Sequence, residues 1–268
     1  MRMGISVPTF GEFADVRVLA DLAGTAESAG WDGFFVWDHV VWPWADEIVD
    51  AWIALAAVAL RTERIRFGPL VAPLPRRRPA KVARETVTLD RLSGGRLILG
   101  AGAGDFPAEF TDLGEAGDAV TRAAMLDEAL TVVDALWSGE AVHFNGAHYQ
   151  VRGARFRPRA LQRPRIPVWI GGQWPRPGSL ARAARWDGYV PIKADQSATT
   201  PADVAAMAHR LDLASRPGFD LVVFGSDEDI AGYASAGATW WIDSLLPWEP
   251  SLTEMQRRAA AGPPGRSV

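Results

Sequence analysis

The sequence predicts an α/β protein built as a (β/α)8 barrel, and three observations support that prediction. Short apolar runs alternate with helical patterns along all 268 residues. Most of the apolar runs are nearly continuous, as expected for parallel strands that are covered on both faces. The length agrees with a barrel, because such domains often have about 250 residues. A doubly wound open sheet gives the same alternation and stays the second candidate.

The alternation predicts eight strands and eight helices. The predicted strands are Met3–Val7, Gly33–Trp37, Ile65–Val71, Arg96–Ala101, Pro167–Gly171, Gly188–Ile192, Asp220–Phe224 and Thr239–Asp243. The predicted helices are 15–30, 50–60, 79–92, 119–137, 179–185, 201–214, 227–236 and 252–261. Asp15 is a favourable N-cap, Gly30 is a favourable helix end, and Pro79 suits a first helical turn.

One region interrupts the alternation. Residues 141–151 form two short alternating runs around Asn145-Gly146, a dipeptide typical of a hairpin turn. We therefore expect a short hairpin insertion, at about 138–166, after the fourth helix of a single 1–268 domain. The tail at 262–268 is expected to be loose.

Composition excludes several classes of function. The formal net charge of −4 is no electrostatic footprint for nucleic acid or an anionic membrane. The absence of Cys excludes disulfides, thiolate zinc sites and thiol nucleophiles. The sequence contains neither a His-x-His nor an HExxH motif, so a metal site is disfavoured. Without a signal-peptide pattern or a long apolar span, we expect a cytoplasmic protein.

Tryptophan is unusually frequent, with 12 residues against 3 Tyr. Trp commonly fills cores, but several lie at predicted strand ends or in the loops that follow, where they suit a flat aromatic ligand. These are Trp37, Trp42, Trp44, Trp169, Trp174 and Trp248.

Barrel enzymes place their chemistry at the carboxyl ends of the strands, and Asp38 and His39 follow the second strand. His39 is a candidate general acid or base near neutral pH. A hydrogen-bonded loop histidine is the alternative interpretation. His143 and His148 in the hairpin and His209 within a helix are weaker candidates.

The fourth strand runs into a loop with glycines at Gly100, Gly102 and Gly104, which allow close approach of a ligand. Since the loop is not GxGxxG and follows the fourth strand, a dinucleotide site is disfavoured. Asp105 and Glu109 are its acidic candidates, and a solvated loop is equally compatible with the pattern.

The fifth strand ends in a glycine turn that leads into a helix, an arrangement typical of phosphate binding. The predicted ligands of this site are Gly171, Gly172, Arg176, Gly178 and Ser179. A plain turn is the alternative. After the third strand, the run Arg76–Arg78 is interpreted mainly as a set of solvated side chains at the rim of the barrel. Binding of an anionic cofactor tail is the less favoured function.

These segments together resemble the bacterial-luciferase-like superfamily of flavin- and deazaflavin-dependent oxidoreductases. The matching segments, in chain order, are GISVP, AESAGWDGFFVWDH, GPLVAPLPRRRPAKVARETVTLDRLSGGRLILGAGAG, IPVWIGG, RAARWDGYVP, GATWWIDSLLPW and RRAAAGPPGR. The resemblance implies a (β/α)8 barrel with an insertion that binds reduced FMN or the deazaflavin coenzyme F420 in its mouth.

The resemblance also assigns roles to residues. It implies that His39 is the acid/base residue, with Asp38 beside it as a catalytic and cofactor-binding residue that orients the cofactor or backbone donors, and with Trp44 lining the pocket. A non-proline cis peptide is expected within Pro69–Val71, so that Pro69, Leu70 and Val71 lie under the cofactor ring, and Gly102 and Gly104 near it. In the sugar-phosphate dehydrogenase branch a Glu follows these glycines, and here that position is Asp105.

A second acid/base role is therefore left open between Asp105 and Glu109. An Asn expected nearby is Ala108 here, and the shorter stretch between Ile192 and Phe219 predicts a reduced substrate lid. Trp42, Trp44, Trp174 and Lys193 are the predicted substrate pocket.

The most favoured function is an oxidoreductase that transfers a hydride with coenzyme F420, with His39 as acid/base. The Trp-Asp-His signature favours F420 over FMN, which would make the protein a monooxygenase instead. A non-catalytic flavin-binding protein and a cofactor-free hydrolase using Asp38, His39 and Asp105 are the other candidates. The expected partners are a small-molecule substrate and a second copy in a homodimer.

Overall fold

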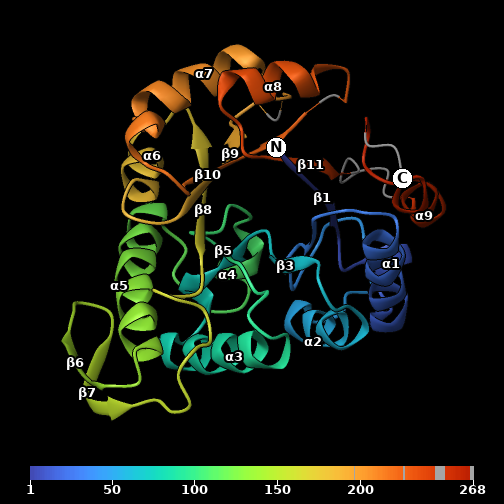
Figure 1. The fold of residues 1–268 in the computed structure, drawn as a ribbon. Coiled ribbons are helices and arrows are strands. Elements are labelled where there is room, and N and C mark those ends of the chain that lie inside the picture. The colour runs from blue at the N-terminus through green and yellow to red at the C-terminus, as the bar shows by residue number, and fades with distance from the viewer. Residues whose placement is uncertain (196, 226, 245–250, 266–268) are drawn as a thin grey trace.

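A closed parallel barrel forms the centre of the computed structural model, which describes residues 1–195, 197–225, 227–244 and 251–265 (Figure 1). Its sheet has the strand order β3-β2-β1-β11-β10-β9-β8-β5-β4, and all neighbours pair in parallel. The strands are β1 (Arg2–Val7), β2 (Gly33–Val36), β3 (Arg66–Pro69), β4 (Ala72–Pro73), β5 (Leu99–Gly102), β8 (Val168–Trp174), β9 (Gly188–Lys193), β10 (Asp220–Phe224) and β11 (Trp240–Ser244). Trp248 and the tail from residue 266 lie outside the described residues.

The barrel closes through the third predicted strand, which is divided into two. β3 pairs with β2, β4 pairs with β5, and the non-proline cis peptide Leu70–Val71 lies between them. The Phe67 amide donates to the Arg96 carbonyl at 3.3 Å, and the Ile98 amide donates to the Phe67 carbonyl at 2.9 Å. These bonds join the two ends of the sheet, so the predicted barrel is confirmed and the open-sheet alternative is wrong.

Helices surround this barrel (Figure 1). They are α1 (Val16–Ser28), α2 (Ala51–Arg61), α3 (Pro79–Leu92), α4 (Ala108–Thr111), α5 (Ala119–Trp137), α6 (Pro177–Ala183), α7 (Pro201–Arg210), α8 (Ile230–Ala236) and α9 (Leu252–Ala261). Asp15 and Asp50 cap α1 and α2 by accepting first-turn amides. The short helix α4 was not predicted. Among the described residues, none of the helices combines the length and apolar character of a membrane span.

Three aromatic rings fill the barrel interior. Phe35, Trp169 and Trp240 lie with ring centroids 5.3 to 5.9 Å apart, and all three are fully buried. Glycines provide the space: a Cβ on Gly188 would lie 2.4 Å from the Trp169 ring, and one on Gly33 would lie 2.7 Å from Trp240. Trp169 therefore belongs to the core and does not line a ligand site.

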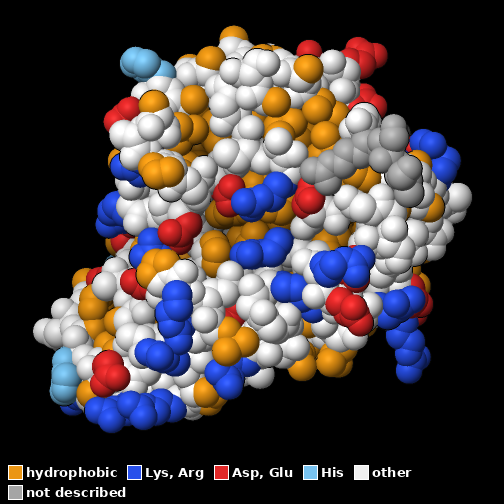
Figure 2. Space-filling model, viewed as in Figure 1, with side chains coloured by type: hydrophobic (Ala, Val, Ile, Leu, Met, Phe, Trp, Pro, Cys, Tyr) orange, Lys and Arg blue, Asp and Glu red, His pale blue; other side chains and the backbone are white. Residues whose placement is uncertain are grey.

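The hairpin strands β6 (Ala141–Asn145) and β7 (Gln150–Arg155) pair antiparallel outside the barrel, between α5 and β8. The Glu128 carboxylate accepts three backbone amides of the turn, those of residues 147 to 149. Residues 141–165 carry Arg side chains and no Asp or Glu. Lys and Arg side chains accordingly gather over this corner of the molecule (Figure 2).

Candidate active site at the barrel mouth

His39 follows β2 and meets an acidic partner that lies 70 positions later in the chain. Its Nδ1 lies 3.2 Å from Oε2 of Glu109, which is placed by the short helix α4 after β5. The His39 side chain is 26% exposed, whereas that of Glu109 is 2% exposed. Because strands β2, β3/β4 and β5 are neighbours in the barrel, their carboxyl ends bring these two residues together.

Glu109 is held as an ion by its surroundings. The Val40 amide donates to Oε1 at 2.7 Å, and Nη1 of Arg76 forms an ion pair with the same oxygen at 3.0 Å. Burial opposes ionisation, but the contacts from His39, Val40 and Arg76 outweigh it and keep the pKa of Glu109 below its ordinary value. An ionised Glu109 requires a proton on Nδ1 of His39, so Nε2 is the ring nitrogen left for chemistry.

Asp38 is the other carboxylate of this corner, and its oxygens are fully engaged. Arg76 donates to Oδ1 at 2.8 Å, Arg77 donates to both oxygens, and the Trp52 indole donates to Oδ2 at 3.1 Å. Arg76 therefore bridges Asp38 and Glu109. Its side chain is only 5% exposed, so the interpretation of Arg76 and Arg77 as a solvated rim is wrong. The buried carboxylates of Asp38 and Glu109 compensate the charge of these arginines, and the interpretation from sequence did not take those carboxylates into account.

An aromatic cluster surrounds His39, and Trp42 is its centre. The Trp42 ring lies 4.6 Å from His39, stacks on Phe10 at 4.9 Å, and reaches Phe106 at 5.9 Å. Trp44 touches Trp42 at 5.7 Å but is 71% exposed. Of the two predicted pocket tryptophans of this loop, Trp42 is thus the one in ring contact with His39.

The glycine loop after β5 is shaped by its own neighbours. A Cβ on Gly102 or Gly171 would lie 2.9 Å from the Val71 side chain, and one on Gly104, whose φ is +78°, would lie 2.3 Å from Phe110. These glycines admit Val71 and Phe110 to the mouth, which leaves Val71 as an apolar floor between β5 and β8 beside the cis peptide. The cis peptide thus lies where the resemblance placed it.

Asp105, the other acidic candidate, is exposed and separate from His39 in the hydrogen-bond network. Its contact is with the Gln173 side-chain amide, at 3.4 Å. The buried Oε1 of Gln173 has no hydrogen-bond partner among the described residues. Gln173, at the end of β8, was not singled out by sequence reasoning, since a lone Gln after two glycines carries no distinctive signal.

The predicted phosphate loop leads into α6, which begins at Pro177, two residues before the expected start. The Ser179 hydroxyl contacts the carbonyls of Gln173 and Arg176 at 3.0 Å, so it fastens the turn. Gly178 has open space around its Cα, and its first-turn amide and that of Ser179 have no helical carbonyl to bond.

Lys193 and Trp174, both predicted to line the substrate pocket, are bound by a third residue. Lys193 Nζ lies 3.4 Å from Asp203, and the Trp174 indole donates to the same carboxylate at 3.1 Å. These contacts anchor β8 and β9 to the start of α7. They leave the Lys193 charge compensated.

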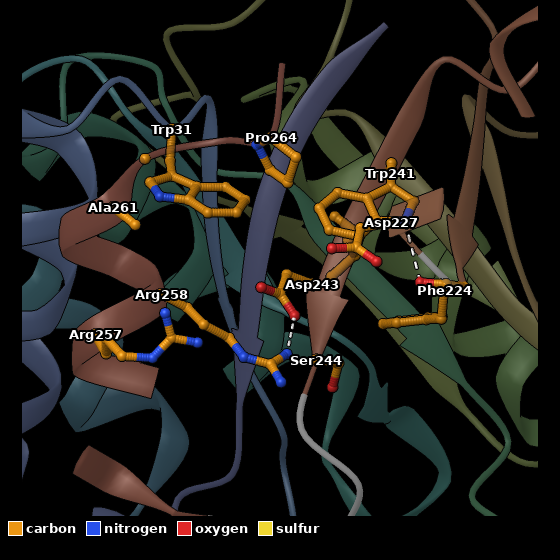
Figure 3. Close-up of a pocket in the computed structure, with 13 residues that line it drawn as sticks. Trp31, Phe224, Asp227, Trp241, Asp243, Ser244, Arg257, Arg258, Ala261 and Pro264 are labelled. Carbon is orange, nitrogen blue, oxygen red and sulfur yellow. Dashed lines mark hydrogen bonds and ion pairs between the residues drawn. The ribbon is translucent and has the colours of Figure 1, made fainter. Parts of the chain in front are cut away.

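A cavity of about 360 Å³ lies elsewhere, between the ends of β10 and β11 and helix α9 (Figure 3). Trp31 and Trp241 lie on one side of it, and Asp243 pairs with Arg258 at 2.8 Å. Burial raises the pKa of Asp243. No residue predicted to act in catalysis lines this cavity, so the chemistry is assigned to the barrel mouth.

Comparison with known proteins identifies the family. A family model described as luciferase-like monooxygenase matches residues 1–226. The chain belongs to the luciferase-like monooxygenase family. The family resemblance expected from the sequence is therefore confirmed.

Relatives within this family include F420-dependent glucose-6-phosphate dehydrogenases. The chain is 34% identical to the Microbacterium testaceum enzyme, over 64% of this chain and 51% of the length of that relative. It is 30% identical to the Nocardia farcinica enzyme, over 92% of this chain and 74% of the length of that relative. The chain thus spans about half the length of the Microbacterium relative.

Solved structures show the same fold. The coenzyme F420-dependent tetrahydromethanopterin reductase of Methanopyrus kandleri matches with a TM-score of 0.76 at 20% identity, over 97% of each chain. An F420-dependent secondary alcohol dehydrogenase, solved with an F420-acetone adduct, matches with a TM-score of 0.78 at 16% identity, over 97% of this chain and 98% of that one.

The mouth fits a flat, phosphorylated, flavin-type cofactor. Val71 supplies an apolar floor, Gln173 an unpaired acceptor, and Gly178 and Ser179 free amides beside open space. This donor set matches a ring with a polar edge and an anionic arm. Gln173 lies on β8 and Gly178 and Ser179 lie on α6, whereas Val71 lies between β3 and β4 beside the cis peptide.

Proposed function

We propose that this protein is an F420-dependent oxidoreductase in which His39 moves a proton at the substrate oxygen. The observation that supports this proposal most strongly is the contact of His39 with Glu109, which lies beside a barrel mouth that fits a flavin-type cofactor. The membership of the luciferase-like family and the F420-dependent relatives support the choice of cofactor. The predicted roles of Asp38, Gly102, Gly104 and the phosphate loop remain part of this proposal.

In the proposed reaction, the residues divide into those that act and those that hold. Glu109 fixes the His39 ring through Nδ1, which presents Nε2 to the substrate. In the oxidising direction Nε2 accepts the proton of an alcohol as its carbon gives up a hydride, and in the reducing direction it returns that proton. Arg76 forms ion pairs with both Glu109 and Asp38 and so holds the two carboxylates in place. Asp38 is a positioning residue, since its oxygens are already bonded.

The cofactor would lie on Val71, with its phosphate toward Gly178 and Ser179 and within reach of Arg176. When bound, F420 supplies two-electron hydride exchange and reacts poorly with oxygen. Trp42 and Phe106 exclude water from the neighbourhood of His39. Asp105, exposed at the same rim, is the second candidate for contact with the substrate.

An FMN-dependent monooxygenase is the alternative function. It is favoured by the fold match to an FMN-bound 3,6-diketocamphane monooxygenase of Pseudomonas putida. That match has a TM-score of 0.67 at 20% identity, over 84% of this chain and 66% of the other chain. Titration of the cofactor-free protein with F420 and with FMN, followed by a turnover screen, decides between them. Tighter F420 binding with hydride exchange supports the proposal. Tighter FMN binding with oxygen consumption overturns it, and binding without turnover of any substrate indicates a non-catalytic flavin protein.

We also propose a cytoplasmic homodimer, the location expected from the sequence pattern and the assembly expected from the resemblance. Helix α2 offers a surface for it, since Ile53 and Leu60 lie seven positions apart and are exposed at 63% and 73%. Sedimentation at working concentration tests the assembly. A monomer contradicts it.

A further inference from the structure

The aromatic cluster around His39 is made by three separate loops at the mouth. Phe10 comes from the loop after β1, Trp42 and Trp44 from that after β2, and Phe106 from that after β5. Trp42 contacts all the others with ring centroids between 4.9 and 5.9 Å. Val40 and Val41 add exposed apolar surface next to His39, at 43% and 36%. A substrate that reaches His39 therefore meets apolar and aromatic surface.

The charges of the network formed by Asp38, Arg76, Arg77 and Glu109 cancel each other. Arg76 and Arg77 both pair with Asp38, and the nearby buried Arg122 lies over the Phe110 ring and donates to the carbonyls of Gly104 and Gly117. Two carboxylates and two guanidinium groups give a neutral sum. Across the mouth, Asp203 compensates Lys193.

An anionic substrate would find an unfavourable partner at the same rim. Asp105 precedes Phe106, is exposed, and accepts a 3.4 Å contact from the Gln173 side-chain amide. Its carboxylate would repel a phosphate or carboxylate held near Phe106. Of the undescribed residues, those at 196, 226 and 245–250 contain no Lys, Arg or His in the sequence, and the C-terminal stretch 266–268 contains Arg266.

A polar group of the cluster also has no partner in the protein. Nε1 of Trp42 is buried and makes no hydrogen bond to any described residue. An unpaired buried N–H is energetically unfavourable, and a hydrogen-bond acceptor on a ligand removes that penalty. A neutral carbonyl or hydroxyl oxygen beside His39 is such an acceptor.

We infer that the substrate is an uncharged ketone or secondary alcohol that carries a flat apolar group, and not a phosphorylated sugar. The inference rests on the proposed function and narrows it. The carbinol oxygen lies at Nε2 of His39, and the flat group stacks on Trp42 and Phe106. Trp42 and Phe106 thereby become the specificity-determining residues.

Matched pairs of compounds test this inference. Mandelate is 1-phenylethanol with a carboxylate in place of the methyl group, and benzoylformate stands in the same relation to acetophenone. With F420 bound, we expect kcat/KM for 1-phenylethanol to exceed that for mandelate and for glucose 6-phosphate by about a hundredfold or more. Equal or reversed preference overturns the inference and leaves the hydride chemistry intact.

A binding measurement separates the inference from the proposed function. Ligand-observed NMR with the full-length protein should show acetophenone binding and little benzoylformate binding, whether or not any turnover occurs. Trp42→Ala should weaken acetophenone binding about tenfold, because it removes stacking and the indole donor. Phe156→Ala, an aromatic change on the segment after β7, is the matched control and should leave binding unchanged. Tighter binding of benzoylformate, or binding of neither ketone, overturns the inference.

Discussion

The two sides of the barrel mouth are built on different principles. On the side of β2, β4 and β5, side chains of Asp38, Arg76 and Glu109 bond one another and leave only His39 partly exposed. On the side of β8 and β9, side chains are used to fasten turns, and backbone amides beside Gly178 are left open. From this difference we propose that the first side serves proton transfer and the second side holds a ligand. Changes on the two sides should therefore have separable effects.

The largest expected effect on stability comes from Arg76. Arg76→Met removes the cation shared by two buried carboxylates and should lower the free energy of unfolding by about 3–5 kcal/mol. Lys193→Met, the matched change across the mouth, should cost about 0–1 kcal/mol, because its pair with Asp203 is partly exposed. Urea unfolding measures both. Equal losses would mean that the two sides do not differ in this way.

Glu109→Gln should separate orientation from ionisation. The variant loses a charged acceptor for His39, worth about 1.5–3 kcal/mol, so turnover should fall about 10- to 100-fold with F420 affinity retained. Since the pKa of Glu109 is lowered in the folded state, its stabilising contribution is present above the unfolded pKa of about 4.3 and is lost as pH falls through the folded pKa.

The same variant gives a pH test of stability. The difference in unfolding free energy between wild type and Glu109→Gln should narrow as pH falls below about 5. Chemical denaturation at a series of pH values measures this difference. Curves that stay parallel in that range would show that Glu109 is not held ionised by its neighbours.

Gly178 should show the smallest effect, and only on binding. Because open space surrounds it, Gly178→Leu should leave the thermal midpoint unchanged while it blocks the free amides and weakens F420 binding by about 1–3 kcal/mol. Gly172→Leu is the contrast, since a Cβ there would lie 2.2 Å from the Ser179 side chain and should disturb the fold. Unchanged F420 affinity in Gly178→Leu would remove the phosphate loop from the cofactor site.

The barrel was predictable because its signals are local. Parallel strands buried on both faces read as continuous apolar runs, and β10 has the predicted bounds of Asp220–Phe224. Helix starts at Asp15 and Asp50 follow from the capping of first-turn amides. The division of β3 from β4 and the short helix α4 depend on tertiary contacts, and the sequence pattern did not predict them.

The sequence offered candidate site residues but did not predict which of them come into contact. His39 and Glu109 were both candidates, yet nothing in their spacing of 70 residues indicates that they meet. The same reason explains the error at Arg76, because an arginine run looks solvated until the carboxylates facing it are known. The resemblance assigned Trp44 to the lining of the pocket. In the structure, the ring of Trp42 is the one that lies against His39.

The most direct test is a single turnover of bound F420 in wild type and in His39→Asn, with His209→Asn on the exposed face of α7 as the control. The account predicts F420 affinity within a few-fold in all three proteins. It predicts hydride transfer slowed about 10²- to 10⁴-fold in His39→Asn alone, the range for losing a general acid or base. Equal rates in wild type and His39→Asn, or loss of F420 binding in that variant, would contradict it.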